Sequence, residues 1–142
     1  VEDISSIISK VDLDIIQLHG NENIDDYTIF NKDIINTIHA SENIQSQLSK
    51  INLNKHMHLI DATDNQMRGG SGITFDWNIL KDLDCEKLFI AGGLKPDNIL
   101  DLLSRYTPKC VDVSSGIERK VGYKDHKIMS DFVETIRTYY EK

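Results

Sequence analysis

The chain has 142 residues, of which 39% are hydrophobic and 27% charged, and its net charge is −7. That length suits one domain spanning residues 1–142. The acidic balance argues against nucleic-acid binding, which needs a basic face, although backbone N–H groups can still bind a small anion. No apolar run approaches the ~20 residues of a membrane helix, and the opening VEDISSIISK does not read as a signal peptide. We therefore expect a cytoplasmic protein with neither a membrane nor a nucleic acid as partner.

Helical and extended segments are expected to alternate along the chain. Residues 2–11 have a helical period, and strands are expected at residues 13–20, 33–40, 56–62, 87–93 and 110–117. A short helix or turn at 22–31 and helices at 41–51, 76–83, 95–106 and 125–142 follow these strands. Five strands that each precede a helix predict an α/β fold with a parallel sheet.

Several helix ends carry recognisable signals. Ser41 and Asp76 are expected N-caps, and Pro96 lies near the first turn of its helix. The last helix should bury one face, formed by Ile128, Met129, Phe132, Val133 and Ile136.

Glycine is distributed unevenly between the two ends of the expected strands. Seven of the eight glycines lie at or after a strand's carboxyl end, and only Gly122 lies elsewhere. The links that lead from helix to strand contain none, although ordinary turns would place glycine there too. The carboxyl edge of a parallel sheet is where ligands bind, and glycine lets backbone N–H groups approach them. The asymmetry therefore predicts a binding site at that edge.

Polar residues gather at the same edge. The first strand ends in Gln17 and His19, the third in Asp61, and the fifth carries Asp112 before Ser114 and Ser115. The glycine pair after the fourth strand, Gly92 and Gly93, and the serines after the fifth resemble the loops that hold phosphate in barrels. The stretch GGSG fits neither a P-loop nor a dinucleotide fingerprint, so ATP and NAD are not expected.

Cysteine and histidine do not predict a metal or redox site. Cys85 and Cys110 form no CxxC pair, which suits a reducing compartment. His56 and His58 have a spacing that would suit ligands on a strand, but no third ligand is evident. No metal site is therefore expected.

Four motifs together resemble the phosphoribosylanthranilate isomerase family of tryptophan biosynthesis. They are IIQLHGNE, LIDATDNQMRGGSGITFDW, LFIAGGLKPDNI and VDVSSGIE with GYKD, in the family's order, from about Ile15 to Ile128. The resemblance implies an α/β fold of the (β/α)8 TIM-barrel type, with the five strands here as strands four to eight. The chain would then be the C-terminal two-thirds of the family's barrel, and the first three βα units would be absent.

The resemblance also implies a reaction and a role for each matching residue. The reaction is an Amadori rearrangement of N-(5-phosphoribosyl)anthranilate that needs no cofactor. Asp61 matches the general acid, and Gln17, His19, Gly70 and Gly72 would bind the phosphorylated substrate. The phosphate group would rest at Gly92, Gly93, Asp112, Ser114 and Ser115. The family's catalytic cysteine and a substrate-binding arginine belong to the absent units, and we expect neither Cys85 nor Cys110 to replace that cysteine because both lie at the opposite end of the strands.

One departure and two alternatives remain open at this stage. Ile73 stands where the family often has a basic or polar residue in GGTGKTFDW. The chain could be another phosphate-binding barrel such as indole-glycerol-phosphate synthase, although no expected strand ends in lysine as that enzyme requires. It could also be a non-catalytic fragment with open sheet edges that self-associates or needs a complementing N-terminal segment.

Overall fold

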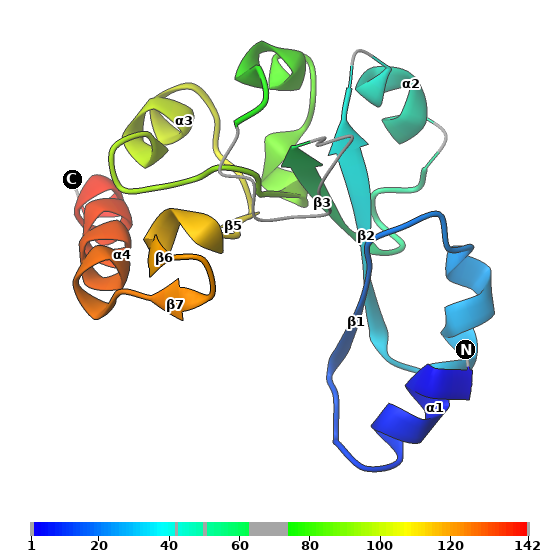
Figure 1. Cartoon of the computed structure of the whole chain (residues 1–142). Helices are drawn as coiled ribbons and strands as arrows, with labels where there is room; N and C mark the ends of the chain where they lie inside the picture. The colour runs from blue at the N-terminus through cyan, green and yellow to red at the C-terminus, as the bar shows by residue number, and fades with distance from the viewer. Residues whose placement is uncertain (1, 42, 50, 63–73, 142) are drawn as a thin grey trace.

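A five-stranded parallel sheet, in the order β1-β2-β3-β4-β5, forms the centre of the described chain. The computed structural model describes residues 2–41, 43–49, 51–62 and 74–141. The strands are β1 (Ile15–Leu18), β2 (Asp33–Ala40), β3 (Met57–Ala62), β4 (Leu88–Ile90) and β5 (Cys110–Val111). Each strand pairs with the next along the chain, as the alternating sequence pattern predicts. The sheet curves into an open arc (Figure 1).

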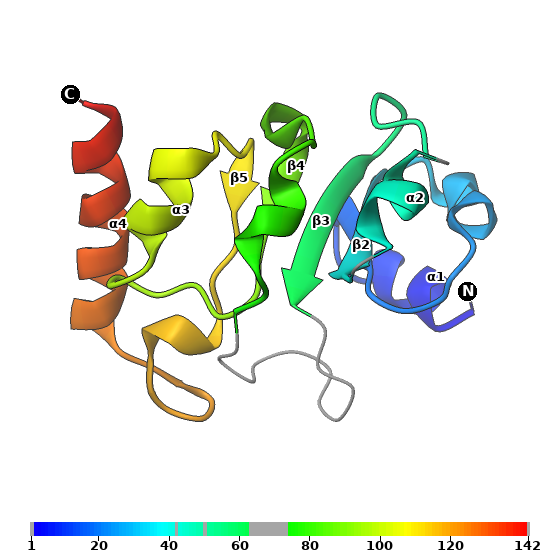
Figure 2. The ribbon, with the colours of Figure 1, turned by 90° about the horizontal axis from the view of Figure 1, so that it is seen from above.

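Helical segments connect the strands and lie around the convex side of this arc (Figure 2). The α-helices are α1 (Glu2–Ile8), α2 (Ile44–Leu48), α3 (Ile99–Arg105) and α4 (His126–Tyr140). The 3₁₀ helices are η1 (Ile24–Phe30), η2 (Trp77–Leu80), η3 (Cys85–Lys87) and η4 (Ser115–Ile117). None of the described helices is both long and apolar enough to cross a membrane.

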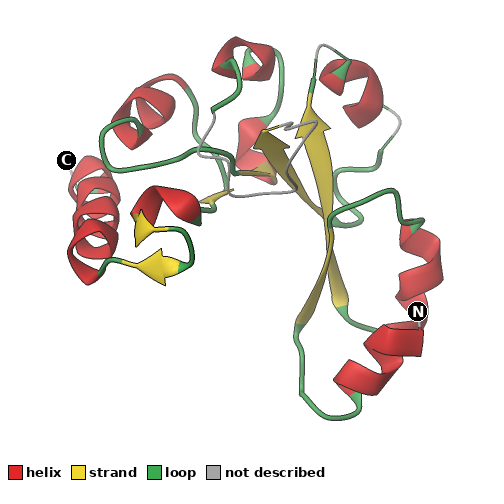
Figure 3. Cartoon of the chain, in the orientation of Figure 1, coloured by secondary structure: helices red, strands yellow, loops and turns green. Residues whose placement is uncertain are grey.

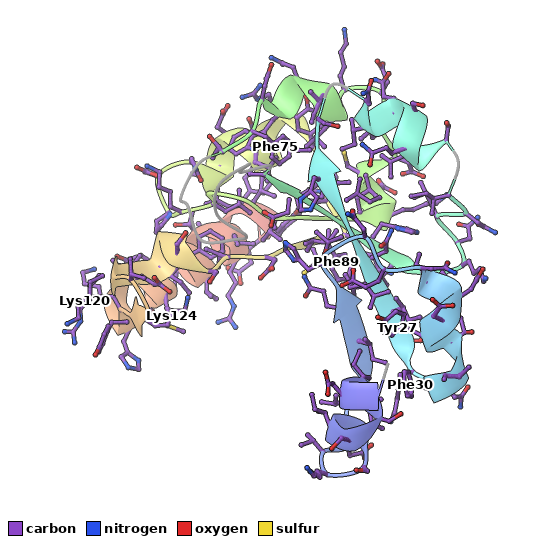
Figure 4. The ribbon with its side chains drawn as sticks, turned by 45° about the vertical axis from the view of Figure 1, so that its right-hand side comes forward. Tyr27, Phe30, Phe75, Phe89, Lys120 and Lys124 are labelled. Carbon is purple, nitrogen blue, oxygen red and sulfur yellow. The ribbon has the colours of Figure 1, made fainter. Side chains whose placement is uncertain are left out.

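The buried side chains form two separate clusters. The larger cluster lies between the middle of the sheet and its covering helices, with Ile60, Leu80, Ile90 and Leu102 at 0% exposure. The smaller cluster contains Ile16, Leu18 and Ile34, on which α1 and η1 pack. Tyr27 and Phe30 of η1 belong to its margin, with ring centroids 6.5 Å apart (Figure 4).

The helix ends confirm one predicted cap and contradict the other. Asp76 is the N-cap of η2, where its side chain accepts a hydrogen bond from the N–H of Asn78. The predicted cap at Ser41 is wrong, because α2 starts later and Asn43 is its N-cap. Ser41 instead uses its carbonyl to close a turn with Ile44 and its hydroxyl to accept from Gln47. The helix predicted at 76–83 is a short 3₁₀ helix.

The fifth strand is much shorter than residues 110–117. It ends at Val111. The N–H of Asp112 still donates to the carbonyl of Ile90, and beyond it the chain leaves the sheet to form η4. A two-stranded antiparallel hairpin then follows, made of β6 (Glu118–Lys120) and β7 (Tyr123–Lys124), which the sequence analysis did not predict (Figure 3). Gly122 lies at its turn with a φ of +78°.

The last helix was predicted correctly in position, but its apolar face is only partly buried. Asp125 caps α4 by accepting hydrogen bonds from the N–H groups of Lys127 and Ile128. Phe132 is buried and Ile128 and Ile136 pack against the larger cluster. Met129 and Val133 of the same face are exposed.

Buried His58 on β3 predicts a pH dependence of stability. Its side chain has 0% exposure, and burial, with a smaller effect of His56, lowers its pKa below the usual 6.5. In the unfolded chain the imidazole takes up a proton as the pH falls below about 6.5, whereas in the folded chain it does so only at a lower pH. The free energy of unfolding should therefore fall as the pH drops from 6.5 toward the folded-state pKa.

Urea unfolding at several pH values measures this effect. His58→Met should flatten the pH profile between pH 7 and pH 5.5, while His126→Gln, at an exposed position on α4, controls for loss of a surface histidine. An unchanged slope in His58→Met would assign the pH dependence to other groups.

Candidate functional site

The register of the sheet brings the predicted polar residues to one edge. His39 pairs with Asp61 across β2 and β3, and Ala91 continues β4 by bonding to the carbonyl of Ile60. Because the strands are parallel, their carboxyl ends and the segments that follow them lie side by side. Polar and glycine residues from four strand ends therefore lie close together at the carboxyl edge of the sheet.

A cavity of about 430 Å³ opens at this edge. All predicted site residues that the structure describes contribute to its lining: Gln17, His19, Asp61, Gly92, Gly93, Asp112, Ser114 and Ser115. Three further lining residues, Ala91, Leu94 and Gly116, were not predicted as site residues. Gly70 and Gly72 lie outside the described residues.

Asp61 is the least exposed carboxylate of the cavity. Its side chain is 14% exposed, and its Oδ1 accepts a hydrogen bond from the N–H of Ala62 at 2.8 Å. Its Oδ2 lies 3.4 Å from Nε2 of His19. One oxygen is thus held by the backbone, and the other faces a ring from a different strand end.

His19 connects the acid to the first strand. Nε2 of Gln17 lies 3.4 Å from the His19 Nδ1 and also donates to the hydroxyl of Thr37 at 3.3 Å. The rings of His19 and His39 meet edge to face, with centroids 5.7 Å apart. Thr37 and His39 were not predicted as site residues from the sequence. Both lie on β2, and only the strand register shows that they neighbour Gln17 and Asp61.

Gly92 lets the fourth strand end pack directly on the third. A Cβ at this position would lie 2.6 Å from both the backbone N and the Cβ of Ala62, and 3.0 Å from Oδ1 of Asp61. Its φ of +87° also lies in the region that favours glycine. No larger residue fits beside the acid.

Asn98 holds the loop that follows these glycines. Its side-chain N–H donates to the carbonyl of Gly93 at 3.0 Å, and its Oδ1 accepts from the N–H of Lys95 at 2.9 Å. The sequence motif contains Asn98, but its role depends on side-chain geometry that periodicity does not show.

Three residues of the cavity lining have backbone N–H groups without a partner among the described residues. Among the described residues, the N–H groups of Gly92, Gly93 and Ser115 make no hydrogen bond. Such groups at a strand end are suited to bind the oxygens of an anion. The carboxylate of Asp112 shares the rim.

The two cysteines lie away from this cavity, as the sequence predicted. Cys85 is buried in η3, before β4, and Cys110 begins β5. Burial raises the pKa of both thiols, with nearby Asp84 and Asp112 adding to the effect. Neither thiol is placed or activated to act as a base at Asp61. Among the described residues, no three His, Cys, Asp or Glu side chains are arranged to hold a metal ion.

Comparison with known proteins identifies the relatives of this chain. A family model described as "N-(5'phosphoribosyl)anthranilate (PRA) isomerase" matches residues 1–135. The PRA isomerase of Oceanobacillus iheyensis is 42% identical over 139 residues, which cover 96% of this chain and 67% of the relative. That of Legionella pneumophila strain Corby is 38% identical over 131 residues, covering 92% of this chain and 63% of the relative.

The chain belongs to the PRA isomerase family. It spans 63% of the length of the Legionella relative. The solved PRA isomerase of Thermotoga maritima superposes with a TM-score of 0.79 at 30% identity, covering 96% of this chain and 68% of that one. Another solved PRA isomerase, 28% identical with a TM-score of 0.73, was crystallised in complex with reduced 1-(o-carboxyphenylamino)-1-deoxyribulose 5-phosphate. The parallel α/β fold of this chain is therefore that of PRA isomerases, which are TIM-barrel-like.

Proposed function

We propose that this chain carries the general acid and the phosphate site of a PRA isomerase acting in cytoplasmic tryptophan biosynthesis. The reaction converts N-(5′-phosphoribosyl)anthranilate to 1-(2-carboxyphenylamino)-1-deoxyribulose 5-phosphate. The observation that carries the proposal is that Asp61 and His19 line one cavity together with residues from two other strand ends whose backbone N–H groups have no partner among the described residues. Membership of the family and the product analogue bound to a solved relative support it.

Asp61 is the residue that donates the first proton. The furanose ring must open at the bond between C1′ and the ring oxygen, and that oxygen needs a proton as it leaves. Oδ1 of Asp61 is held by Ala62, so the proton would be carried on Oδ2, the oxygen on the His19 side. The nitrogen of the anthranilate group supplies the electron pair, and a protonated Schiff base results. A positioned acid of this kind contributes about 10²–10⁴-fold to a rate.

A base must then remove the proton from C2′. Removal gives an enolamine, which becomes the ketone when it tautomerises. Neither cysteine in these 142 residues lies at the cavity. We therefore assign the base to a part of the enzyme outside the described strands, where the family resemblance places a catalytic cysteine after the first strand of the barrel.

The two ends of the substrate would lie at opposite sides of Asp61. The anthranilate group would contact His19, with Gln17 behind it, because these residues come from the first strand of the sheet. The phosphate would accept hydrogen bonds from the N–H groups of Gly92, Gly93 and Ser115, beside Asp112 and Ser114. Gly70 and Gly72 are proposed to close over the sugar phosphate.

The five strands would be strands four to eight of a (β/α)8 barrel, within one phosphate-binding domain. Within the described residues β1 pairs only with β2, and β5 only with β4. Both edges of the arc are thus free to accept further strands. This arrangement also favours the second candidate, in which the chain binds phosphate but turns over substrate only with a complementing N-terminal segment or through self-association.

Isomerase activity of the purified chain tests the proposal, followed as loss of the substrate's anthranilate fluorescence. The chain should be assayed alone and mixed with the first three βα units of a relative such as the Oceanobacillus iheyensis enzyme, with intact mass recorded for each sample. Turnover in either sample supports the proposal, and turnover only in the mixture supports complementation. If both samples bind phosphate but neither turns over substrate, the chain is a phosphate-binding module without isomerase activity. If neither sample binds phosphate or turns over substrate, the assignment is overturned.

A further inference from the structure

Lys124 contacts Ser114, a residue of the cavity lining, but does not itself line the cavity. It is the last residue of β7, in the hairpin labelled in Figure 4, and its side chain contacts Ser114, ten residues earlier in the chain. Its ammonium donates to the carbonyl oxygen of Ser114 at 2.8 Å and to the hydroxyl of Ser114 at 3.2 Å. The same ammonium pairs with Oε1 of Glu118 at 2.7 Å.

The carbonyl of Ser114 accepts two hydrogen bonds, one from Lys124 at 2.8 Å and a longer one from the N–H of Ile117 at 3.4 Å, and together they orient the next peptide group. In a trans peptide the C=O and the N–H that follows it point in opposite directions. Because the carbonyl of Ser114 points toward Lys124, the N–H of Ser115 points away from it. That N–H has no acceptor among the described residues, and Ser115 lines the cavity.

Donation to a carbonyl also polarises the N–H of the same peptide group. Hydrogen bonds in a chain strengthen one another, and bonds that involve an ionised group are the stronger ones. The ammonium of Lys124 therefore makes the Ser115 N–H a stronger hydrogen-bond donor, although the ammonium itself does not line the cavity.

The hairpin keeps Lys124 in this position. Glu118 and Lys124 are directly opposite each other across β6 and β7, and Glu118 also accepts from the N–H of Gly122 at 3.0 Å. These hydrogen bonds, that from Lys124 first, lower the pKa of the Glu118 carboxyl, which keeps its charge and its pairing with the ammonium. Immediately after Lys124, the N–H of Asp125 donates to the carbonyl of Ile117, which ties the hairpin to η4.

We propose that Lys124 is a positioning residue that orients the Ser114–Ser115 peptide so that the Ser115 N–H can bind a phosphoryl oxygen. The inference rests on the phosphate site of the proposed function and adds to it a cation outside the cavity. The hairpin of β6 and β7 is accordingly a support for the anion site.

Four variants separate the effects of charge, donation and local structure. Lys124→Met removes both charge and donor, Lys124→Gln keeps a neutral donor, and Lys124→Arg keeps both. Lys120→Met is the matched control: it removes the same charge from the same hairpin, where Lys120 lies over the ring of Tyr123 and not at Ser114. Thermal unfolding of each variant shows which remain folded, and Lys124→Gln and Lys124→Arg keep the test decisive if Lys124→Met unfolds.

The measurement is an NMR titration of the chain with inorganic phosphate, read at the Ser115 amide. Before phosphate is added, Lys124→Met should shift the Ser115 amide resonance and Lys120→Met should not. On titration, Lys124→Met should weaken binding by about tenfold, since a hydrogen bond from a charged group is lost. Lys124→Arg should restore most of the affinity, and Lys124→Gln should lie between the two.

The outcomes separate this inference from the proposed function. Unaltered phosphate affinity and an unshifted Ser115 amide in folded Lys124→Met or Lys124→Gln would overturn the role of Lys124 and leave the phosphate site standing. Equal losses in Lys124→Met and Lys120→Met would also overturn it, because net charge alone would then explain them. If the unmodified chain binds no phosphate at this amide, the phosphate site itself is wrong and the inference falls with it.

Discussion

Replacing Asp61 by asparagine in an active isomerase that contains this chain is expected to lower kcat by about 10²–10⁴-fold. Asparagine has nearly the same shape and can still accept the hydrogen bond from Ala62 through its side-chain oxygen. It cannot supply a proton to the ring oxygen of the sugar. KM should therefore stay close to that of the unaltered enzyme while turnover is lost, which steady-state kinetics on N-(5′-phosphoribosyl)anthranilate will show.

Asp97→Asn is the matched control for this experiment. Asp97 is an exposed carboxylate whose partner is Lys95, and it lies outside the cavity lining. Its variant should have unaltered kinetics. Near-normal turnover in Asp61→Asn would contradict the general-acid assignment. A raised KM with unaltered kcat would instead make Asp61 a residue that only binds the substrate.

Gly116→Ala is expected to have the largest effect on stability. A Cβ at this position would lie 1.7 Å from the carbonyl oxygen of Leu94 and 2.8 Å from its carbonyl carbon. Both are backbone atoms, so the segment after β5 and the loop after β4 would have to move apart. We expect a loss of about 3 kcal/mol in the free energy of unfolding, the upper end of the usual cost of overpacking. Phosphate binding should be lost as well, because Gly116 and Leu94 both line the cavity.

Gly122→Ala distinguishes this packing effect from a backbone effect. An added Cβ there would meet no atom within 4 Å, but the φ of +78° disfavours alanine. The cost should be about 1–2 kcal/mol, from the left-handed conformation alone, and phosphate binding should persist. Urea unfolding and phosphate titration of both variants provide the comparison. Equal stabilities and equal affinities would show that the two cavity segments are not in the contact described.

The sequence predicted the sheet and the location of the cavity because both depend on regular patterns. Alternating strands and helices require a parallel sheet, and the glycines at strand ends such as Gly92 and Gly116 mark the edge where the backbone must pack closely. Residues at or after the carboxyl ends of separate strands, among them His19, Asp61 and Ser115, could thus be placed together from the sequence.

The sequence did not predict the short hairpin, the Lys124 contact or the correct helix cap, because none of these depends on a regular pattern. The hairpin of β6 and β7 is too short and too exposed to show an alternating pattern, and Gly122 was its only signal. The contact between Lys124 and Ser114 joins a side chain to a carbonyl ten residues away. Ser41 and Asn43 are both good capping residues, and the turn that Ser41 closes with Ile44 decided between them.

Different hydrophobic clusters support the two halves of the cavity, which are the half with Gln17 and His19 and the half proposed to bind phosphate. Gln17 lies in β1 and His19 follows it, and the buried residues of this strand, Ile16 and Leu18, belong to the small cluster with α1 and η1. The phosphate half rests on Leu94 and Ile117 of the large one. A unit with so few buried residues opens at a lower free energy than the rest of the chain. A substrate that contacts both halves would therefore join two cooperative units and slow hydrogen exchange along β1, far from its own phosphate.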